Sequence, residues 1–185
     1  MQAKSTGAAV PVESSRTAYS ETVANPDGSY AFSSTLQPQR ARKGQGWATP
    51  DAKLRANADG TVAPVASVSG LTLSGGGTGP LAVLDDGAGH KLAVSMPMRL
   101  PRPRLDGDTA TYPGVLPGVD LQVTATVQGG LSEVLVVHDA AAAANPALAR
   151  LRLATAAQGL QRPQGAQARA TGTGNTTHGG ATTRR

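Results

Sequence analysis

Hydrophobic and polar residues alternate along much of the chain with the two-residue period of β-strands. In residues 119–128, the apolar positions Val, Leu, Val, Ala and Val alternate with Asp, Gln and Thr. Because successive side chains of a strand point to opposite faces, this pattern predicts a strand with one buried and one solvent-facing surface. A Gly-Gly turn and residues 131–139 follow. The apolar run 134–137 predicts a return strand that is covered on both faces.

Turn sequences between other alternating segments predict further hairpins and one helix. Residues 17–37 flank the sequence NPDG, in which Gly28 supplies the positive φ that a tight turn needs. Residues 81–96 flank the turn-forming sequence DDGAG and predict a second hairpin. A short helix is expected near residues 139–149, where Asp139 precedes an alanine run and can cap it.

These elements predict an all-β fold, a β-sandwich of mostly antiparallel strands with disordered ends. Of the 32 Leu and Val residues, 26 lie between positions 62 and 153, so the core is expected there. We place a disordered lead at 1–15, a β-rich module at 16–160 and a disordered basic tail at 161–185, which has no large apolar residue. The abrupt change near Gln161 suggests the hypothesis of a shifted reading frame or a truncated gene.

Charge and composition exclude several classes of function. The net charge is +5, but arginines of the tail supply +4, and residues 1–160 hold 13 basic and 12 acidic groups. We therefore predict no specific nucleic-acid partner. The absence of cysteine excludes disulfides, thiol catalysis and Cys-ligated zinc. No apolar run approaches the ~20 residues of a membrane span, and the first 15 residues show no signal peptide.

Glycine-rich and acidic motifs along the chain have simple structural interpretations. The sequence SGGGTGP at 74–80 lacks the Gly-Lys-Ser/Thr ending of a phosphate-binding loop, and no helical pattern follows it. We interpret it as an inter-strand loop. The acidic sequences at 85–89 and 106–108 lack the twelve-residue spacing of a calcium-binding EF-hand loop, and are interpreted as turns.

The candidate acid–base residues do not predict an active site. Ser132, His138 and Asp139 supply the residue types of a catalytic triad. Adjacent strand residues point to opposite faces, however, so His138 and Asp139 are not expected to pair. We expect Asp120 to face solvent or to accept hydrogen bonds from the preceding Pro-Gly-Val turn. The sequence therefore predicts no catalytic, cofactor-binding or metal-binding residue and no enzymatic activity.

Four segments carry a resemblance to a known group of proteins. They read SSRTAYSETVANPDGSYAF, LTLSGGGTGPLAVLDDGAGHKLAVSMP, ATYPGVLPGVDLQVTA and GLSEVLVVHDAAAAANPAL. Residues 14–158 resemble the N-terminal β-rich module of large secreted proteins of high-GC Gram-positive bacteria, which often continue into DNRLRE modules, laminin-G-like jelly rolls or RHS-repeat toxin shells. The resemblance implies a secreted or cell-surface location and, as partners, downstream modules of the same longer protein.

The function predicted from the sequence is that of a non-enzymatic structural or interaction module. The alternative is a carbohydrate-binding module for cell-wall glycan, with Trp47 and Tyr112 as the candidate platform residues. A hydrolase fragment ranks third. Aromatic residues make up 3% of the chain. With so few aromatics, Trp47 is interpreted first as a packing anchor.

Overall fold

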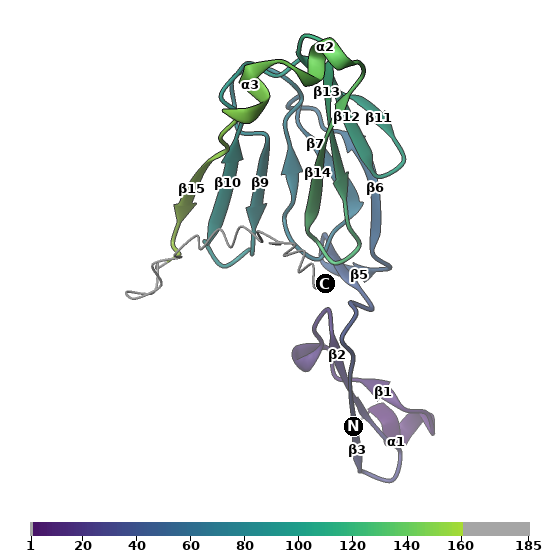
Figure 1. The fold of residues 1–185 in the computed structure, drawn as a ribbon. Coiled ribbons are helices and arrows are strands. Elements are labelled where there is room, and N and C mark those ends of the chain that lie inside the picture. The colour runs from purple at the N-terminus through teal and green to yellow at the C-terminus, as the bar shows by residue number, and fades with distance from the viewer. Residues whose placement is uncertain (1, 161–185) are drawn as a thin grey trace, which may run out of the picture.

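The structure is a computed structural model that describes residues 2–160, so the predicted tail at 161–185 lies outside the described residues. All strand pairs in it are antiparallel, and they form four sheets. The two larger sheets form a sandwich-like body, and a three-stranded sheet lies outside it (Figure 1). The predicted all-β fold with mostly antiparallel strands is confirmed.

The larger sheets have six and four strands. The six-stranded sheet has the order β15-β10-β9-β8-β7-β6, with β6 at Asp51–Ala56, β7 at Val62–Ala66, β8 at Thr72–Leu73, β9 at Ala82–Asp85, β10 at Lys91–Ser95 and β15 at Ala154–Gln158. The four-stranded sheet has the order β11-β12-β13-β14, with β11 at Arg104–Asp106, β12 at Thr109–Leu116, β13 at Val119–Ala125 and β14 at Leu131–Val137.

The hydrophobic core lies between these two sheets. The predicted alternation of β13 is confirmed, because its apolar side chains are buried and its polar side chains lie half-buried on the other face. The largest of the described side chains that are less than 2% exposed come from both layers: Leu73, Leu81, Tyr112, Val119 and Val123. Fully burying one Val or Leu side chain contributes about 1.5–3 kcal/mol, so these positions hold the two sheets together.

Strand β14 differs from its prediction. The apolar run was expected to be covered on both faces, but Val134 is 55% exposed and Val137 is 39% exposed. Val134 lies opposite Gln122, on the outer face of the sheet, whereas Val137 lies opposite the core residue Val119 but on the last strand of the sheet, which pairs with β13 alone. An apolar run therefore does not by itself show that a second layer covers a strand.

The predicted helix near 139–149 is confirmed as two short helices, α2 (Ala140–Ala143) and α3 (Pro146–Ala149). The Asp139 carboxylate caps α2 by accepting a hydrogen bond from the Ala142 backbone N–H at 2.7 Å. Ala142 packs closely on Gly118, where a Cβ atom would lie 2.7 Å from the Ala142 Cβ. The helices thus close over the β12–β13 turn.

The predicted disordered lead is wrong for the described part of residues 1–15. This segment contains α1 (Gln2–Thr6), β1 (Val10–Pro11) and a 3₁₀ turn at Glu13–Ser15. Strand β1 pairs with β2 (Ser20–Ala24), which pairs with β3 (Tyr30–Ser34) to complete the three-stranded sheet. Pairing with β2 gives this otherwise polar lead its order, and its few apolar residues did not reveal that pairing. The NPDG hairpin is as predicted, with Gly28 at a φ of +92°.

A small hairpin of β4 (Ala41–Lys43) and β5 (Gly46–Ala48) connects the three-stranded sheet to the sandwich (Figure 1). Arg40, just before this hairpin, donates hydrogen bonds to the carbonyl oxygens of Thr17 and Ser20, both at 3.1 Å. Its guanidinium group also lies 3.5 Å from the Glu21 carboxylate. Arg40 therefore fastens the start of the connecting hairpin to the three-stranded sheet.

Candidate functional site

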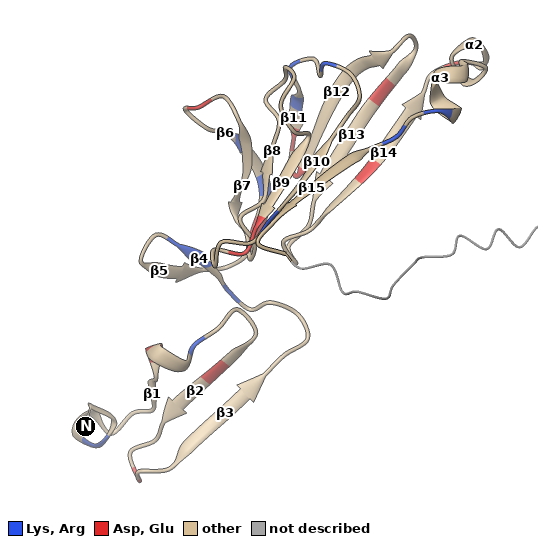
Figure 2. Cartoon of the chain, turned by 90° about the vertical axis from the view of Figure 1, so that its left-hand side faces the viewer, with Lys and Arg blue, Asp and Glu red and all other residues tan. Residues whose placement is uncertain are grey.

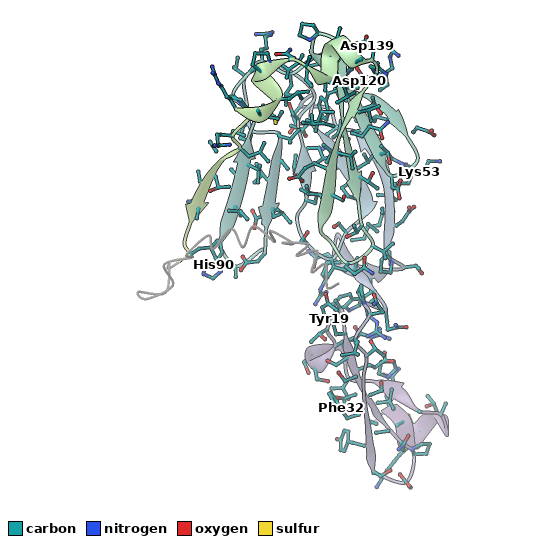
Figure 3. All side chains as sticks on the ribbon, viewed as in Figure 1. Tyr19, Phe32, Lys53, His90, Asp120 and Asp139 are labelled. Atoms are coloured by element: carbon teal, nitrogen blue, oxygen red, sulfur yellow. The ribbon has the colours of Figure 1, made fainter. Side chains whose placement is uncertain are left out.

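Most of the chain's aromatic side chains lie on the peripheral sheet rather than in the core. Tyr19, Tyr30 and Phe32 are 40%, 65% and 69% exposed. Figure 3 labels Phe32 on the three-stranded sheet, away from the sandwich, and Tyr19 just before β2, at the end of that sheet nearest the sandwich. Since the chain has five aromatic residues in all, this distribution places three of them in contact with solvent. Large apolar side chains exposed together are typical of an interaction surface.

Tyr30 and Phe32 lie on the same face of β3, which we call the aromatic face. They are two positions apart, and their partners across the ladder are the small residues Ala24 and Thr22 of β2. The rings therefore stand above their neighbours instead of packing against bulky side chains. Strand β3 carries no charged residue, and in Figure 2 it is tan throughout.

Strand β3 also presents an open backbone edge, because it is the last strand of its sheet. The Thr35 N–H donates to the Tyr19 carbonyl oxygen at 2.9 Å, which identifies this as a hydrogen-bonded pair. Hydrogen-bonded pairs alternate along an antiparallel ladder, so positions 31 and 33 face β2. The N–H and C=O groups of Tyr30, Phe32 and Ser34 therefore face outward. One set of residues thus supplies both the aromatic face and the unpaired backbone groups.

A groove of about 380 Å³ adjoins the aromatic face where α1 approaches the sheet. Its lining includes Ala3 and Lys4 of α1, Val10, Ala24 and Tyr30. Val10 lies directly across from Ala24, which lies across from Tyr30, so the three share the aromatic face. The groove therefore extends the aromatic face toward α1.

Tyr112 is not available as a binding platform, so this part of the sequence prediction is wrong. The side chain is 0% exposed, and its hydroxyl donates to the Ser74 carbonyl oxygen at 2.7 Å. Burial raises the pKa of Tyr112 above its ordinary value of 10.0. The alternation of Ala110 and Tyr112 in β12, both buried, places the ring in the core between the two sheets.

Trp47 is half-buried in β5 and has a cation on its ring. The Arg42 guanidinium carbon lies 4.1 Å from the ring centroid, which is cation–π geometry. The indole Nε1 is buried and has no hydrogen-bond partner among the described residues. Arg42 covers one face of the ring, so a ligand stacking on Trp47 is limited to the other face.

An acid–base pair that the sequence did not predict lies where β13 begins and β14 ends. His138 Nε2 lies 3.1 Å from Asp120 Oδ2, and the Gly114 N–H donates to Asp120 Oδ1 at 2.7 Å. The Gly114 hydrogen bond, followed by His138, lowers the pKa of Asp120. Asp120 thus accepts a hydrogen bond from the earlier Pro-Gly-Val sequence at 113–115, which lies within β12, and not from the adjacent Pro-Gly-Val turn at 117–119 that was predicted to supply it. In the pairing of β13 with β14, Asp120 lies opposite Val136, and His138 follows Val136 by two residues. This strand register is what brings Asp120 and His138 together.

The predicted separation of His138 from Asp139 is confirmed, because Asp139 caps α2 while His138 contacts Asp120. Ser132 lies opposite Thr124, four residues along β13 from Asp120. At 3.3 Å per residue this distance is about 13 Å, so Ser132, His138 and Asp120 do not form a catalytic triad.

The acidic turn at 85–89 uses its carboxylates to hold its own backbone. Asp85 accepts from the Gly87 N–H at 2.7 Å, and its other oxygen lies 3.0 Å from Lys91 Nζ. Asp86 pairs with the His90 ring at 2.5 Å. Within residues 2–160, no group of three or more His, Asp or Glu side chains is placed to hold a metal ion. The interpretation of this sequence as a turn is confirmed.

The fold and the site together define a β-rich protein with a sandwich-like body and a peripheral sheet bearing an exposed aromatic strand. No family model, curated protein or solved structure matches the chain. No helix in the described part of the chain has the length and apolar character needed to cross a membrane.

Proposed function

We propose that this chain is a non-enzymatic structural or interaction module whose contact surface is the aromatic face of β3. The observation that carries the proposal is the exposure of Tyr30 and Phe32, at 65% and 69%. An exposed aromatic pair contributes little to folding, whereas aromatic residues are enriched at the energetic centres of interfaces. The sandwich-like body supplies the scaffold that carries this surface.

The hydrogen bonds of the acidic groups support the non-enzymatic part of the proposal. Asp139 is occupied by the cap of α2, and Asp85 and Asp86 hold their turn. The Asp120–His138 pair lies at the surface and far along the strand from Ser132. A nucleophile, a base and an orienting group must lie within hydrogen-bond reach of one another, and these groups do not.

The module acts in a secreted or cell-surface protein, next to downstream modules of the same longer chain. This part of the proposal rests on the resemblance of residues 14–158 alone. Fractionating cells that express the natural gene, with an antibody against this module, tests it. Detection of the module in the medium or on intact cells supports the location, and its confinement to the cytoplasm contradicts it.

A carbohydrate-binding module is the second candidate, with the platform moved from Trp47 and Tyr112 to the aromatic face. Two aromatic rings on one strand face can stack on successive sugar rings of a cell-wall glycan. The neighbouring groove of about 380 Å³ adds the polar group of Lys4 beside Tyr30. The small partners Ala24 and Thr22 leave the rings accessible from above.

A double substitution, Tyr30→Ser with Phe32→Ser, separates an interaction role from a folding role. We expect the free energy of unfolding to change by less than about 1 kcal/mol, because both rings are mostly exposed. Binding to purified cell-wall glycan, or self-association measured by sedimentation, should fall strongly. The matched control is Ala31→Ser with Ser33→Ala, which alters the opposite face of the same strand. A double variant that binds and associates like the wild type contradicts the proposed surface.

A further inference from the structure

We propose that the partner of β3 is β3 of a second copy of this chain, paired antiparallel about a two-fold axis at Phe32. The inference rests on the proposed interaction role of the aromatic face and names its partner. Pairing joins the two three-stranded sheets into one six-stranded sheet. An isologous two-fold contact is the commonest way for identical chains to associate.

The combination of length, side-chain size and absence of charge distinguishes β3 from the other strands that end a sheet. Like charges that lie opposite one another oppose pairing of a strand with its own copy, and natural edge strands use charges to prevent such pairing. The edge strands β6, β11 and β14 all carry charged residues. Strand β15 has none, but its side chains are Ala, Thr and Gln. The short edge strands β1 and β5 are also uncharged, but they have only two and three residues. Among the described edge strands of at least five residues, β3 alone combines the absence of charge with large apolar side chains.

The outward backbone groups determine the register. Because Tyr30, Phe32 and Ser34 face the open edge, an antiparallel copy must pair through these same positions. The central register places Phe32 opposite Phe32 of the second copy and Tyr30 opposite Ser34 of the second copy. All three outward N–H groups and all three outward C=O groups of each copy then find partners. A register shifted by one position would place residues whose backbone groups face β2 opposite residues whose backbone groups face outward. That register is therefore excluded.

The aromatic face supports the same register. Both Phe32 rings lie on one face of the joined sheet, with Tyr30 of each copy at the neighbouring diagonal position, so four rings form one continuous patch. Five residues per copy bury less than the roughly 1,000 Å² of a stable interface. We therefore expect weak, concentration-dependent association.

Sedimentation equilibrium of the full chain over a wide concentration range is the first test. The wild type should show a monomer–dimer equilibrium. Phe32→Lys places two ammonium groups opposite each other at the two-fold axis and should weaken dimerisation about tenfold or more. Ala31→Lys is the matched control, since it adds the same charge on the other face, opposite Ser33 of the second copy, and should change dimerisation little. A wild type that stays monomeric, or a dimer indifferent to Phe32→Lys, overturns the proposal.

The chain has no natural cysteine, so single cysteines test the register directly. Phe32→Cys places the two Cα atoms about 5.5 Å apart across the axis, within disulfide reach, and should form a cross-linked dimer on mild oxidation. Ala31→Cys places them at a diagonal of about 7–8 Å and should cross-link far more slowly. Equal cross-linking of both variants indicates a parallel pairing and overturns the antiparallel register.

A glycan-binding measurement on the same samples separates this inference from the proposed function. If the chain stays monomeric but binds cell-wall glycan through Tyr30 and Phe32, the result supports the proposed interaction surface and refutes the inference of self-pairing. A chain that neither associates nor binds glycan through these residues contradicts both.

Discussion

The hydroxyl of Tyr112 is the clearest single test of how the two layers of the sandwich are joined. It belongs to β12 of the four-stranded sheet and donates to the Ser74 carbonyl oxygen, which follows β8 of the six-stranded sheet, at 2.7 Å. Both residues are buried. In Tyr112→Phe the ring remains, but a buried carbonyl loses its hydrogen-bond donor. We expect the free energy of unfolding to fall by about 1–3 kcal/mol.

The same substitution has a distinct pH dependence. Burial raises the pKa of Tyr112, so in alkaline solution the unfolded chain releases the phenol proton while the folded chain retains it. The stabilising contribution is fully present below about pH 10, and above that it falls by up to about 1.4 kcal/mol per pH unit. Tyr112→Phe lacks this group. The stability gap between the two proteins should therefore narrow as the pH rises from about 9 to about 11.

Urea unfolding followed by far-ultraviolet circular dichroism measures both effects. Tyr30→Phe is the matched control, since its hydroxyl lies on a ring that is 65% exposed, and it should change stability by less than about 0.5 kcal/mol. A Tyr112→Phe variant as stable as the wild type at neutral pH refutes the role of the hydrogen bond. If the difference in unfolding free energy between the wild type and Tyr112→Phe stays constant through alkaline pH, the raised pKa of the Tyr112 phenol is refuted.

Two further predictions concern the β12–β13 turn and the acid–base pair. Gly118→Ala should lower the free energy of unfolding by about 1–3 kcal/mol, because the new Cβ would lie 2.7 Å from the Ala142 Cβ. In Gly107→Ala the new Cβ would have no atom within 4 Å, so the free energy of unfolding should fall only by the backbone strain of about 1 kcal/mol. Urea titrations of the two variants compare these losses. By NMR, the Asp120 carboxyl should titrate below its ordinary pKa of 3.8, and His138→Ala should raise this pKa only partly, since the hydrogen bond from the Gly114 N–H of β12 remains.

Sequence reasoning succeeded where a local pattern determines the local structure. The alternation in β13 predicted its buried and exposed faces, and Asp139 before an alanine run predicted a helix cap. The NPDG sequence predicted the hairpin and the positive φ at Gly28. Each of these features depends on residues only a few positions apart, so a short stretch of the sequence is enough to predict it.

Sequence reasoning failed where the outcome depends on what lies beside a segment. The apolar run of β14 predicted a strand with two covered faces, yet Val134 lies opposite Gln122 on the outer face of the sheet and is 55% exposed. Strand position within a sheet is a non-local property. The short strand at Val10–Pro11 likewise exists because β2 pairs with it, and its own residues carry little β signal.

The candidate site shows the same division. Tyr112 was a candidate for a surface platform, but its alternation with Ala110 in β12 places it in the core. Tyr30 and Phe32 lie in the hairpin predicted at 17–37, and the sequence does not indicate whether another segment packs over them. Their proposed role as a contact surface rests on their exposure and on the edge position of β3.

Amide hydrogen exchange along β3 tests the central proposal most directly, because it reports on the open edge residue by residue. In dilute solution, the N–H groups of Ala31 and Ser33 should be protected by β2, while that of Phe32 should exchange freely. As the concentration rises, Phe32 should gain protection while the pattern at Ala31 and Ser33 is retained. A Phe32 amide that exchanges freely at every concentration, including in the presence of cell-wall glycan, contradicts the account.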